Sequence, residues 1–180
     1  VSMVWWASAS SFINNKDTGE ELQGLKGQRL YILVSQASDI PRAGTALVTT
    51  LWAAGLGHFE ISKSGAMLSR TIVDSSVWQA NRLDFAAGAS CEKPLIQGRG
   101  KPIIIPGEIE IVDTLTAIPS PDQILQSKAA AAKAAAKQAK QPESEIIREQ
   151  WIESRVDEIV GTTAYTEVRN TARATVIRAV

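Results

Sequence analysis

Apolar residues recur at helical spacing between Ser38 and Gly55, and this pattern organises the prediction for the rest of the chain. Ser38 and Asp39 are good N-cap residues, and Pro41 suits a first helical turn, where its missing N–H costs nothing. Spacings of three and four residues put one set of side chains on a single buried face: Ile40, Ala43, Leu47, Leu51 and Ala54. Gly55 and Gly57 are expected to end the helix.

The segment after this helix predicts a β-hairpin that ends at an acidic residue. Residues 58–62 are short and mixed, and residues 67–73 alternate and are rich in β-branched side chains. Ser64 and Gly65 between them are typical of a turn. Asp74 follows the second strand directly, so we expect it at the rim of a sheet, within reach of a metal or a phosphate. Residues 82–85 are candidates for a strand that closes the sheet.

The N-terminal part predicts further strands. Residues 3–7 are apolar enough for a buried strand, and residues 28–34 are rich in strand formers. In the irregular stretch that follows the hairpin, residues 103–105 are three isoleucines between two prolines, either an edge strand or a segment laid over the core. This order of strands around one helix predicts an α+β fold, in which the helix packs on one face of a largely antiparallel sheet.

The composition changes between residues 113 and 121, which predicts one domain over 1–118 and a helical tail over 119–180. Residues 122–141 favour a helix by intrinsic propensity, although no large apolar residue after Leu125 offers a packing surface. Pro142 is expected to break this helix. The remaining residues predict two more helices, 143–160 and 165–180, that pair in antiparallel fashion.

Charge and composition narrow the function only a little. Nineteen basic and nineteen acidic residues give no net charge, which counts against a protein that coats DNA. The single cysteine, Cys91, excludes an internal disulfide. With no apolar run of the ~18 residues that a membrane span needs and no signal peptide, the sequence favours a cytoplasmic protein without a membrane partner. Because Val1 stands just before an apolar strand, we expect a segment of a longer chain.

Few residues occur in a spacing that indicates a catalytic or ligand-binding site. Asp74 is either a ligand or a turn residue before two serines. Arg70 precedes it by four residues, so strand alternation puts both on one face, either as a plain ion pair or as a triphosphate clamp beside a metal ligand. Arg29 lies in a predicted strand beside Gly27. His58 is the only histidine and lacks the partners of a zinc site or a hydrolase triad.

Two residue types invite a nucleic-acid interpretation. The five tryptophans are scattered over the predicted elements, and we expect them in the core rather than as base-stacking platforms. The lysines of the alanine-rich helix give it a basic character, which is typical of a solvated face but also suits contact with a nucleic-acid backbone; they are Lys128, Lys133, Lys137 and Lys140.

The segments DIPRAG, LWAAGLG, SRTIVDSSVW and NRLDF follow one another between residues 39 and 85. In the order and spacing of these segments, the chain resembles the archaeo-eukaryotic primase superfamily, namely the primase-polymerase domains of phage, plasmid and integrated-element replication proteins. The resemblance covers roughly residues 4–125. It implies an RRM-like catalytic palm with three motifs: an acidic pair on a strand, a small-x-His triplet that contacts the incoming nucleotide, and a hydrophobic-Asp pair that completes the metal site.

Two of these motifs have counterparts here. Val73-Asp74 matches the third, which implies that Asp74 is the catalytic residue that binds Mg²⁺ or Mn²⁺. Gly27-Gln28-Arg29 stands at the second with arginine in place of histidine; arginine can hold phosphate but cannot imitate a neutral imidazole. The resemblance also implies that Arg29 and Arg70 hold the triphosphate, and a small-residue loop offers further nucleotide contacts: Ser8, Ser10 and Ser11.

The first motif is missing, and its place would be upstream of Met3. The resemblance therefore implies a fragment of a DNA primase or primase-polymerase, which performs metal-dependent nucleotidyl transfer on a single-stranded DNA template and is inactive by itself, because two-metal catalysis needs more than one carboxylate. The implied partners are nucleoside triphosphates, the template, which would contact Lys133, Lys137 and Lys140, and a helicase domain or protein. The alternatives are a non-catalytic nucleic-acid-binding module and a protein-interaction module, in which residues 143–180 dock a partner helix.

Overall fold

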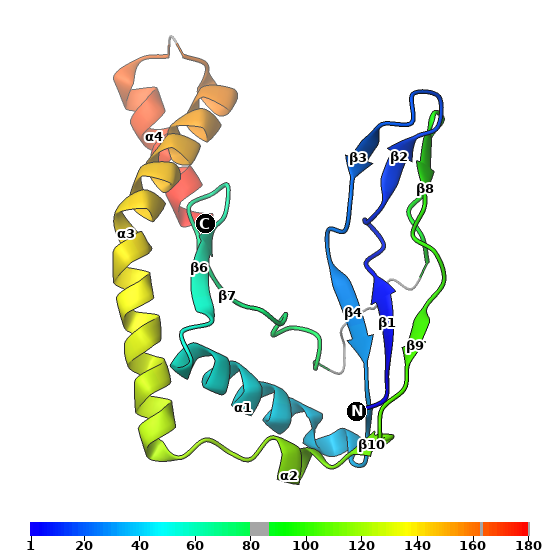
Figure 1. The fold of residues 1–180 in the computed structure, drawn as a ribbon. Helices are drawn as coiled ribbons and strands as arrows, with labels where there is room; N and C mark the ends of the chain where they lie inside the picture. The colour runs from blue at the N-terminus through cyan, green and yellow to red at the C-terminus, as the bar shows by residue number, and fades with distance from the viewer. Residues whose placement is uncertain (80–86, 163, 180) are drawn as a thin grey trace. The chain divides into compact units, whose positions relative to one another are not determined.

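The computed structural model describes residues 1–79, 87–162 and 164–179 (Figure 1). Within these ranges the protein has a mixed α+β fold with several small sheets and one long helix, which confirms the predicted α+β class. The single, largely antiparallel sheet of the prediction is divided into small separate sheets. The strand predicted at residues 82–85 lies outside the described residues. No helix in the described part of the chain is long and apolar enough to cross a membrane.

The contacts divide the chain into two compact units, each described by itself below. Unit 1 comprises Val1–Gly44 and Ser76–Ser120, and unit 2 comprises Thr45–Ser75 and Pro121–Val180. The division passes through helix α1 (Ile40–Ala53). Each unit combines two segments that are far apart in sequence.

Helix α1 confirms the helix predicted from the apolar pattern. A 3₁₀ turn over Ala37–Asp39 leads into it, and the chain leaves it before Gly55, whose φ of 77° lies in the left-handed region. Ala43 and Leu51 are buried as predicted, whereas Ala54 lies past the helix end and is exposed.

The central sheet of unit 1 has the strand order β4-β1-β9 and is antiparallel throughout. The predicted strand at residues 3–7 is β1 (Met3–Ala7), and the three isoleucines form the edge strand β9 (Ile103–Ile105). The strand predicted over 28–34 is interrupted: β4 (Gln28–Tyr31) ends before Ile32, and the chain continues into another sheet.

Two further small sheets complete unit 1. One has the order β3-β2-β8, from β3 (Glu21–Gln23), β2 (Ile13–Asn15) and β8 (Leu95–Gln97), and the other pairs β5 (Leu33–Val34) with β10 (Ile111–Val112) in parallel. These strands are only two or three residues long, too short for a periodic pattern to reveal in the sequence.

A partly buried ion pair, with the hydrogen bonds around it, joins the start of α1 to α2 (Thr114–Ala117) within unit 1. The Nε and Nη2 atoms of Arg42 donate to the two carboxylate oxygens of Asp39 at 2.6 and 2.7 Å. The Thr114 hydroxyl also donates to Asp39, and Arg42 Nη1 donates to the carbonyl oxygen of Ile118 at 2.9 Å. These hydrogen bonds lower the pKa of Asp39 from 3.8 to about 2, with the Arg42 bond as the largest cause.

The predicted hairpin is confirmed in unit 2. Strands β6 (Gly57–Ile61) and β7 (Met67–Thr71) pair in antiparallel fashion, and Gly65 takes a φ of 80° in the turn between them. The hairpin is a two-stranded sheet of its own and not part of one large sheet. Strand β7 ends at Thr71, so the two last residues of the predicted strand lie outside it.

The prediction that Pro142 breaks the tail helix is wrong. Helix α3 (Gln123–Val160) runs for 38 residues with Pro142 inside it. Contacts with the hairpin on the C-terminal side of the proline help to hold it: the Ser144 hydroxyl donates to the carbonyl oxygen of Gly65 at 2.7 Å, and the backbone of Gly65 lies against that of Arg148. These contacts offset the backbone hydrogen bond that proline removes.

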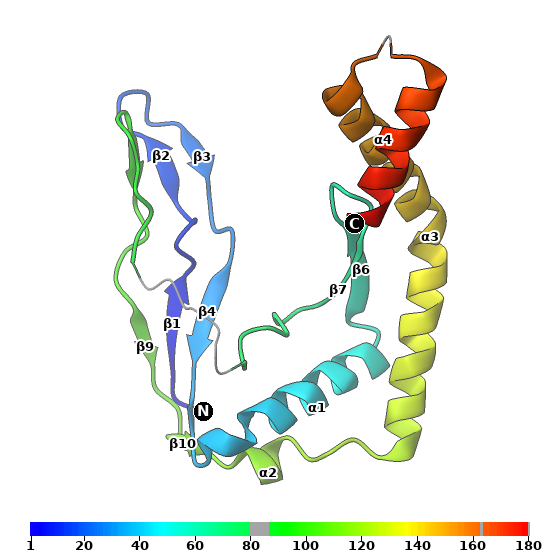
Figure 2. The same cartoon turned by 180° about the vertical axis from the view of Figure 1, so that it is seen from behind.

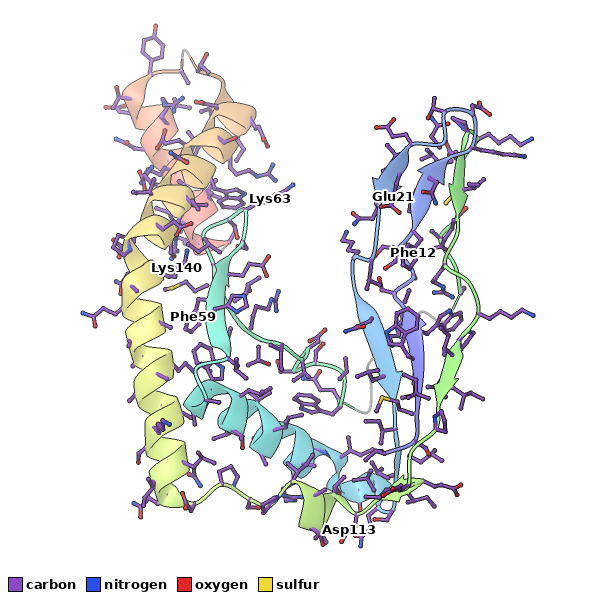
Figure 3. All side chains as sticks on the ribbon, viewed as in Figure 1. Phe12, Glu21, Phe59, Lys63, Asp113 and Lys140 are labelled. Atoms are coloured by element: carbon purple, nitrogen blue, oxygen red, sulfur yellow. The ribbon has the colours of Figure 1, made fainter. Side chains whose placement is uncertain are left out.

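The alanine-rich half of α3 does have a packing surface, contrary to the sequence interpretation. Ala129 is buried in a cluster with Trp52, Ala53 and Phe59, and Figure 3 shows Phe59 on β6 beside α3. Small side chains on the helix let the large rings of the opposite element approach closely. The alanines therefore form a contact face because the bulky residues come from α1 and β6.

The last two helices form the predicted antiparallel pair (Figure 2). The side chains of α3 and α4 (Thr166–Arg178) share a buried cluster, Ile152, Val156, Ala172 and Val176. Ion pairs flank this cluster, from Arg169 to Glu153 and Asp157 and from Arg173 to Glu149 and Glu153. As the residue number rises along α4 it falls along α3, which is the antiparallel arrangement.

We expect Gly65→Ala to destabilise unit 2 more than Gly55→Ala does. Both glycines have left-handed φ values, 80° and 77°, so both substitutions carry a backbone cost of about 1–2 kcal/mol. A Cβ on Gly65 would lie 2.5 Å from the Cβ of Arg148, whereas one on Gly55 would meet nothing within 4 Å. The collision adds about 1–3 kcal/mol. Urea unfolding followed by far-UV circular dichroism measures both, and equal losses would contradict the close contact.

The Asp39 carboxylate should stabilise the folded protein above about pH 4 and lose this effect as the pH falls towards 2. Its pKa is lowered in the folded state, so the ionised form is favoured by folding and protonation removes the gain. Asp39→Asn should therefore be less stable than the wild type at neutral pH, with a difference that narrows in acid. In an Arg42→Gln background the pH-dependent part should shrink. Urea titrations of the four proteins test this, and a constant difference would refute it.

Candidate nucleotide-binding site

The serine loop and the Gly27-Gln28-Arg29 triplet, both predicted to contact nucleotide, meet in unit 1. Ser8 follows Ala7, the last residue of β1, and Gly27 stands just before β4. The backbone N–H of Ser8 donates to the carbonyl oxygen of Gly27 at 2.7 Å. We call this place the Ser8–Gly27 corner; it consists of residues 8–11 and 26–27.

Ser11 holds the corner together from inside. It is fully buried, and its hydroxyl oxygen accepts from the backbone N–H groups of Lys26 at 3.1 Å and Gly27 at 3.4 Å and lies 2.9 Å from the Ser8 hydroxyl. Ser10 is exposed and Ser8 is half-buried. Of the three predicted serines, Ser10 is thus at the surface, Ser8 is partly accessible, and Ser11 contacts the Ser8 hydroxyl from inside.

The backbone turns sharply directly after the corner. Phe12, labelled in Figure 3, has a φ of 56°, which lies in the left-handed region that side chains other than glycine rarely adopt. Its N–H donates to the carbonyl oxygen of Gly24 at 3.0 Å, and its carbonyl oxygen accepts from the N–H of Gly98 at 2.8 Å. This strained residue is anchored on both sides, which fixes the direction in which the serine loop leaves the sheet.

Arg29 lies on β4, two residues after Gly27. The strand register places it directly opposite Trp6 of β1, so the two side chains are on the same face of the sheet. The Nη1 atom of Arg29 is buried. The predicted phosphate-binding arginine thus starts near the corner and lies along the sheet face.

Arg70 and Asp74 belong to unit 2. The Nε atom of Arg70 donates to the Glu60 carboxylate at 2.9 Å, and the two side chains are about half exposed, so this pair contributes little stability. The predicted alternation from Arg70 to Asp74 is wrong, because β7 ends at Thr71 and the chain bends before it reaches Asp74. Asp74 is exposed.

The described residues do not fit a pair of divalent metal ions. Among residues 1–79, 87–162 and 164–179, no group of three or more His, Cys, Asp or Glu side chains converges as metal ligands would. Two-metal sites need several carboxylates around both ions. Asp113, another acidic residue near the predicted boundary, caps α2 by accepting from the N–H of Leu115 at 3.1 Å.

The predicted nucleic-acid lysines lie on α3 in unit 2. Lys133 and Lys137 line an open groove together with Phe59 and Met67 of the hairpin. The Nζ atom of Lys133 lies 6.0 Å from the centre of the Trp52 ring. Lys140, labelled in Figure 3, forms an ion pair with Glu143 at 2.7 Å. Two of the three lysines thus border a groove with an apolar floor.

Arg99 was missed by the sequence interpretation. Its guanidinium carbon lies 3.7 Å from the centre of the Trp6 ring, in unit 1. The only local signal is its position between Gly98 and Gly100 in an irregular stretch, which says nothing about the ring it contacts. The stacking partner is 93 positions away in sequence, so only the structure reveals it.

Comparison with known proteins adds no relative. The chain matched no family model, no curated protein and no solved structure. The primase resemblance therefore rests on the sequence segments given above, and the functions that it implies are proposals.

We expect Ser11→Ala to destabilise unit 1 by about 1–3 kcal/mol, because the N–H groups of Lys26 and Gly27 would lose their buried acceptor. Ser10→Ala is the matched control: its side chain is exposed, so the change should stay within about 0.5 kcal/mol. Chemical unfolding of both variants measures this. Equal and small effects would show that the Ser11 hydroxyl does not hold the corner.

Proposed function

We propose that this chain is part of a DNA primase or primase-polymerase of a mobile genetic element, and that the Ser8–Gly27 corner and Arg29 bind the triphosphate of an incoming nucleotide. The observation that supports this proposal is the meeting of Ser8 with Gly27 at one end of β1 and β4. In this proposal the β4-β1-β9 sheet belongs to an RRM-like palm.

The chemistry of the corner suits a polyphosphate. The guanidinium of Arg29 offers several N–H donors in one plane. The hydroxyls of Ser8 and Ser10 add neutral donors, and the small side chains of this loop let phosphate oxygens approach the backbone. Charged hydrogen bonds of this kind are stronger than neutral ones, so Arg29 should supply most of the phosphate affinity.

In our proposal this chain does not catalyse nucleotidyl transfer by itself. The transferred phosphoryl group is normally stabilised by metal ions held by several carboxylates. Asp74 is the one carboxylate that the resemblance nominates, and the described residues offer no cluster around it. We therefore propose that the chain binds nucleotide and template, and that transfer depends on acidic residues besides these.

The groove of unit 2 supports a template-binding role for the tail. Lys133 and Lys137 put two positive charges on its border, spaced one helical turn apart. A single-stranded DNA backbone can follow such a row, and the affinity would fall steeply with salt. A helicase domain or protein is a further proposed partner of the same tail.

Nucleotide binding tests the corner. We expect Arg29→Gln to weaken the binding of a labelled nucleoside triphosphate about tenfold or more in buffer with EDTA, because a charged hydrogen-bond donor is lost. Lys16→Gln is the matched control, since Lys16 is an exposed cation in the turn between β2 and β3. Equilibrium binding at fixed ionic strength measures both, with circular dichroism to confirm folding. Equal effects of the two variants would contradict a specific phosphate site.

A primer-synthesis assay separates catalysis from binding. With Mg²⁺ or Mn²⁺, nucleotides and a single-stranded template, the chain alone should make no primers, and primer synthesis would refute the inactive-fragment proposal. Binding of Mn²⁺ to the chain that Asp74→Asn abolishes would support the proposed metal role of Asp74. Mn²⁺ binding that Asp74→Asn leaves unchanged would count against that role and leave the Arg29 result unaffected.

A further inference from the structure

One face of the β4-β1-β9 sheet gathers aromatic and cationic side chains. The register pairs Trp6 with Arg29 and Val4 with both Tyr31 and Ile104, and residues directly opposite in an antiparallel sheet point to the same side. We call this side the Trp6 face. Tyr31 is 40% exposed and Ile104 76% exposed, so the face offers large apolar groups to solvent at its two edges.

Arg99 extends this face from the loop that follows β8. Its guanidinium stacks over the Trp6 ring with 3.7 Å between the guanidinium carbon and the ring centre, and its Nη1 donates to the carbonyl oxygen of Ala87 at 3.3 Å. The Trp6 indole N–H donates to the carbonyl oxygen of Gly100 at 3.2 Å. Both planes are therefore held in position by the same loop, and Trp6 is not an ordinary core residue.

The charged side chains of the sheet strands and of the loop around Arg99 are all cationic. Strands β1, β4 and β9 contain no acidic residue, and neither does the loop from Gly98 to Lys101, which carries two cations. Cationic groups beside aromatic planes are a combination that ordinary core packing does not require. It matches the combination of charge and stacking surface found where proteins bind single strands.

We propose that the Trp6 face binds the bases of single-stranded nucleic acid, with one base stacked on the outer side of the Arg99 guanidinium and a neighbouring base on Tyr31. This inference rests on the proposed function and gives the bases of the template a binding surface in addition to the groove proposed for its backbone in unit 2. Arginine planes and aromatic rings stack on every base, so the binding does not depend on sequence.

The geometry of a strand pair favours a single strand over a duplex. Successive side chains on one face of a strand lie about 6.6–6.8 Å apart, which leaves room for separate bases on neighbouring positions. A duplex hides its base planes in its own stack, so it can offer this face only phosphates. The Trp6 face should therefore distinguish a strand that carries bases from one that carries phosphates alone.

The experiment compares a labelled oligothymidine of about 12 nucleotides with an abasic oligonucleotide of the same length, by fluorescence anisotropy on the full chain. The two ligands have the same phosphates, so the ratio of their affinities isolates the bases. We expect the wild type to bind the oligothymidine more tightly, by roughly fivefold or more.

Tyr31→Ala should reduce this ratio by roughly fivefold or more, as expected for the loss of one stacked base. Leu30→Ala is the matched control, because Leu30 is the neighbouring residue of the same edge strand, is 51% exposed and points to the opposite face. Arg99→Lys keeps the charge and removes the plane, so it should lower the ratio and leave abasic binding nearly unchanged. Trp6 is not substituted, because it is a residue of the central strand β1.

Three results would overturn the proposal: no preference for the oligothymidine in the wild type, equal effects of Tyr31→Ala and Leu30→Ala, or an unchanged ratio in Arg99→Lys. Circular dichroism of each variant shows whether it is folded. The nucleotide assay with Arg29→Gln runs in parallel, so a failed stacking proposal with intact nucleotide binding is distinct from a failure of the proposed function. If the wild type binds no nucleotide but still prefers the oligothymidine, the proposed nucleotide site fails and the stacking proposal stands.

Discussion

The contact between the hairpin turn and α3 is the constraint on which unit 2 depends. Gly65 brings its backbone against Arg148 and accepts a hydrogen bond from Ser144, both on the C-terminal side of Pro142. The Trp52 and Phe59 rings cover the alanines on the N-terminal side. Because one supersecondary unit is attached on both sides of the proline, a break in the helix would cost the contacts at one end. The helix therefore continues where the local sequence favours an interruption.

This constraint explains which parts of the fold were predictable. Helix α1, the turn at Gly65 and the pairing of the last two helices follow from signals within a few residues, such as apolar spacing and glycine conformation. The continuity of α3 depends on the hairpin, and the packing of Ala129 depends on rings from other elements. No local pattern contains those partners. The pairing of β6 with β7 in a two-stranded sheet of their own is of the same kind, since alternation predicts a strand but not its neighbour.

The candidate site was likewise predictable only in part. The primase resemblance pointed to Ser8, Ser11 and Gly27, yet only the structure shows that Ser11 is buried and joins the other two. Arg70 looked like a partner of Asp74 because strand alternation was extended too far, and its observed partner is Glu60 across the hairpin. In each case the residue type indicated a polar role, and the strand register decided which groups fulfil it.

In our two proposals, the small sheet of unit 1 joins two kinds of chemistry at one residue. At the end of β1 and β4, hydroxyls and backbone groups suit phosphates, whereas along the face, rings and guanidinium planes suit bases. Arg29 belongs to both, since it follows Gly27 by two residues and lies directly opposite Trp6. A nucleotide held at the corner by Arg29 would thus extend towards the stacking face, so that a base on a neighbouring strand could meet it there. At this position an arginine offers more than a histidine would, because its plane can stack and its several N–H groups can donate.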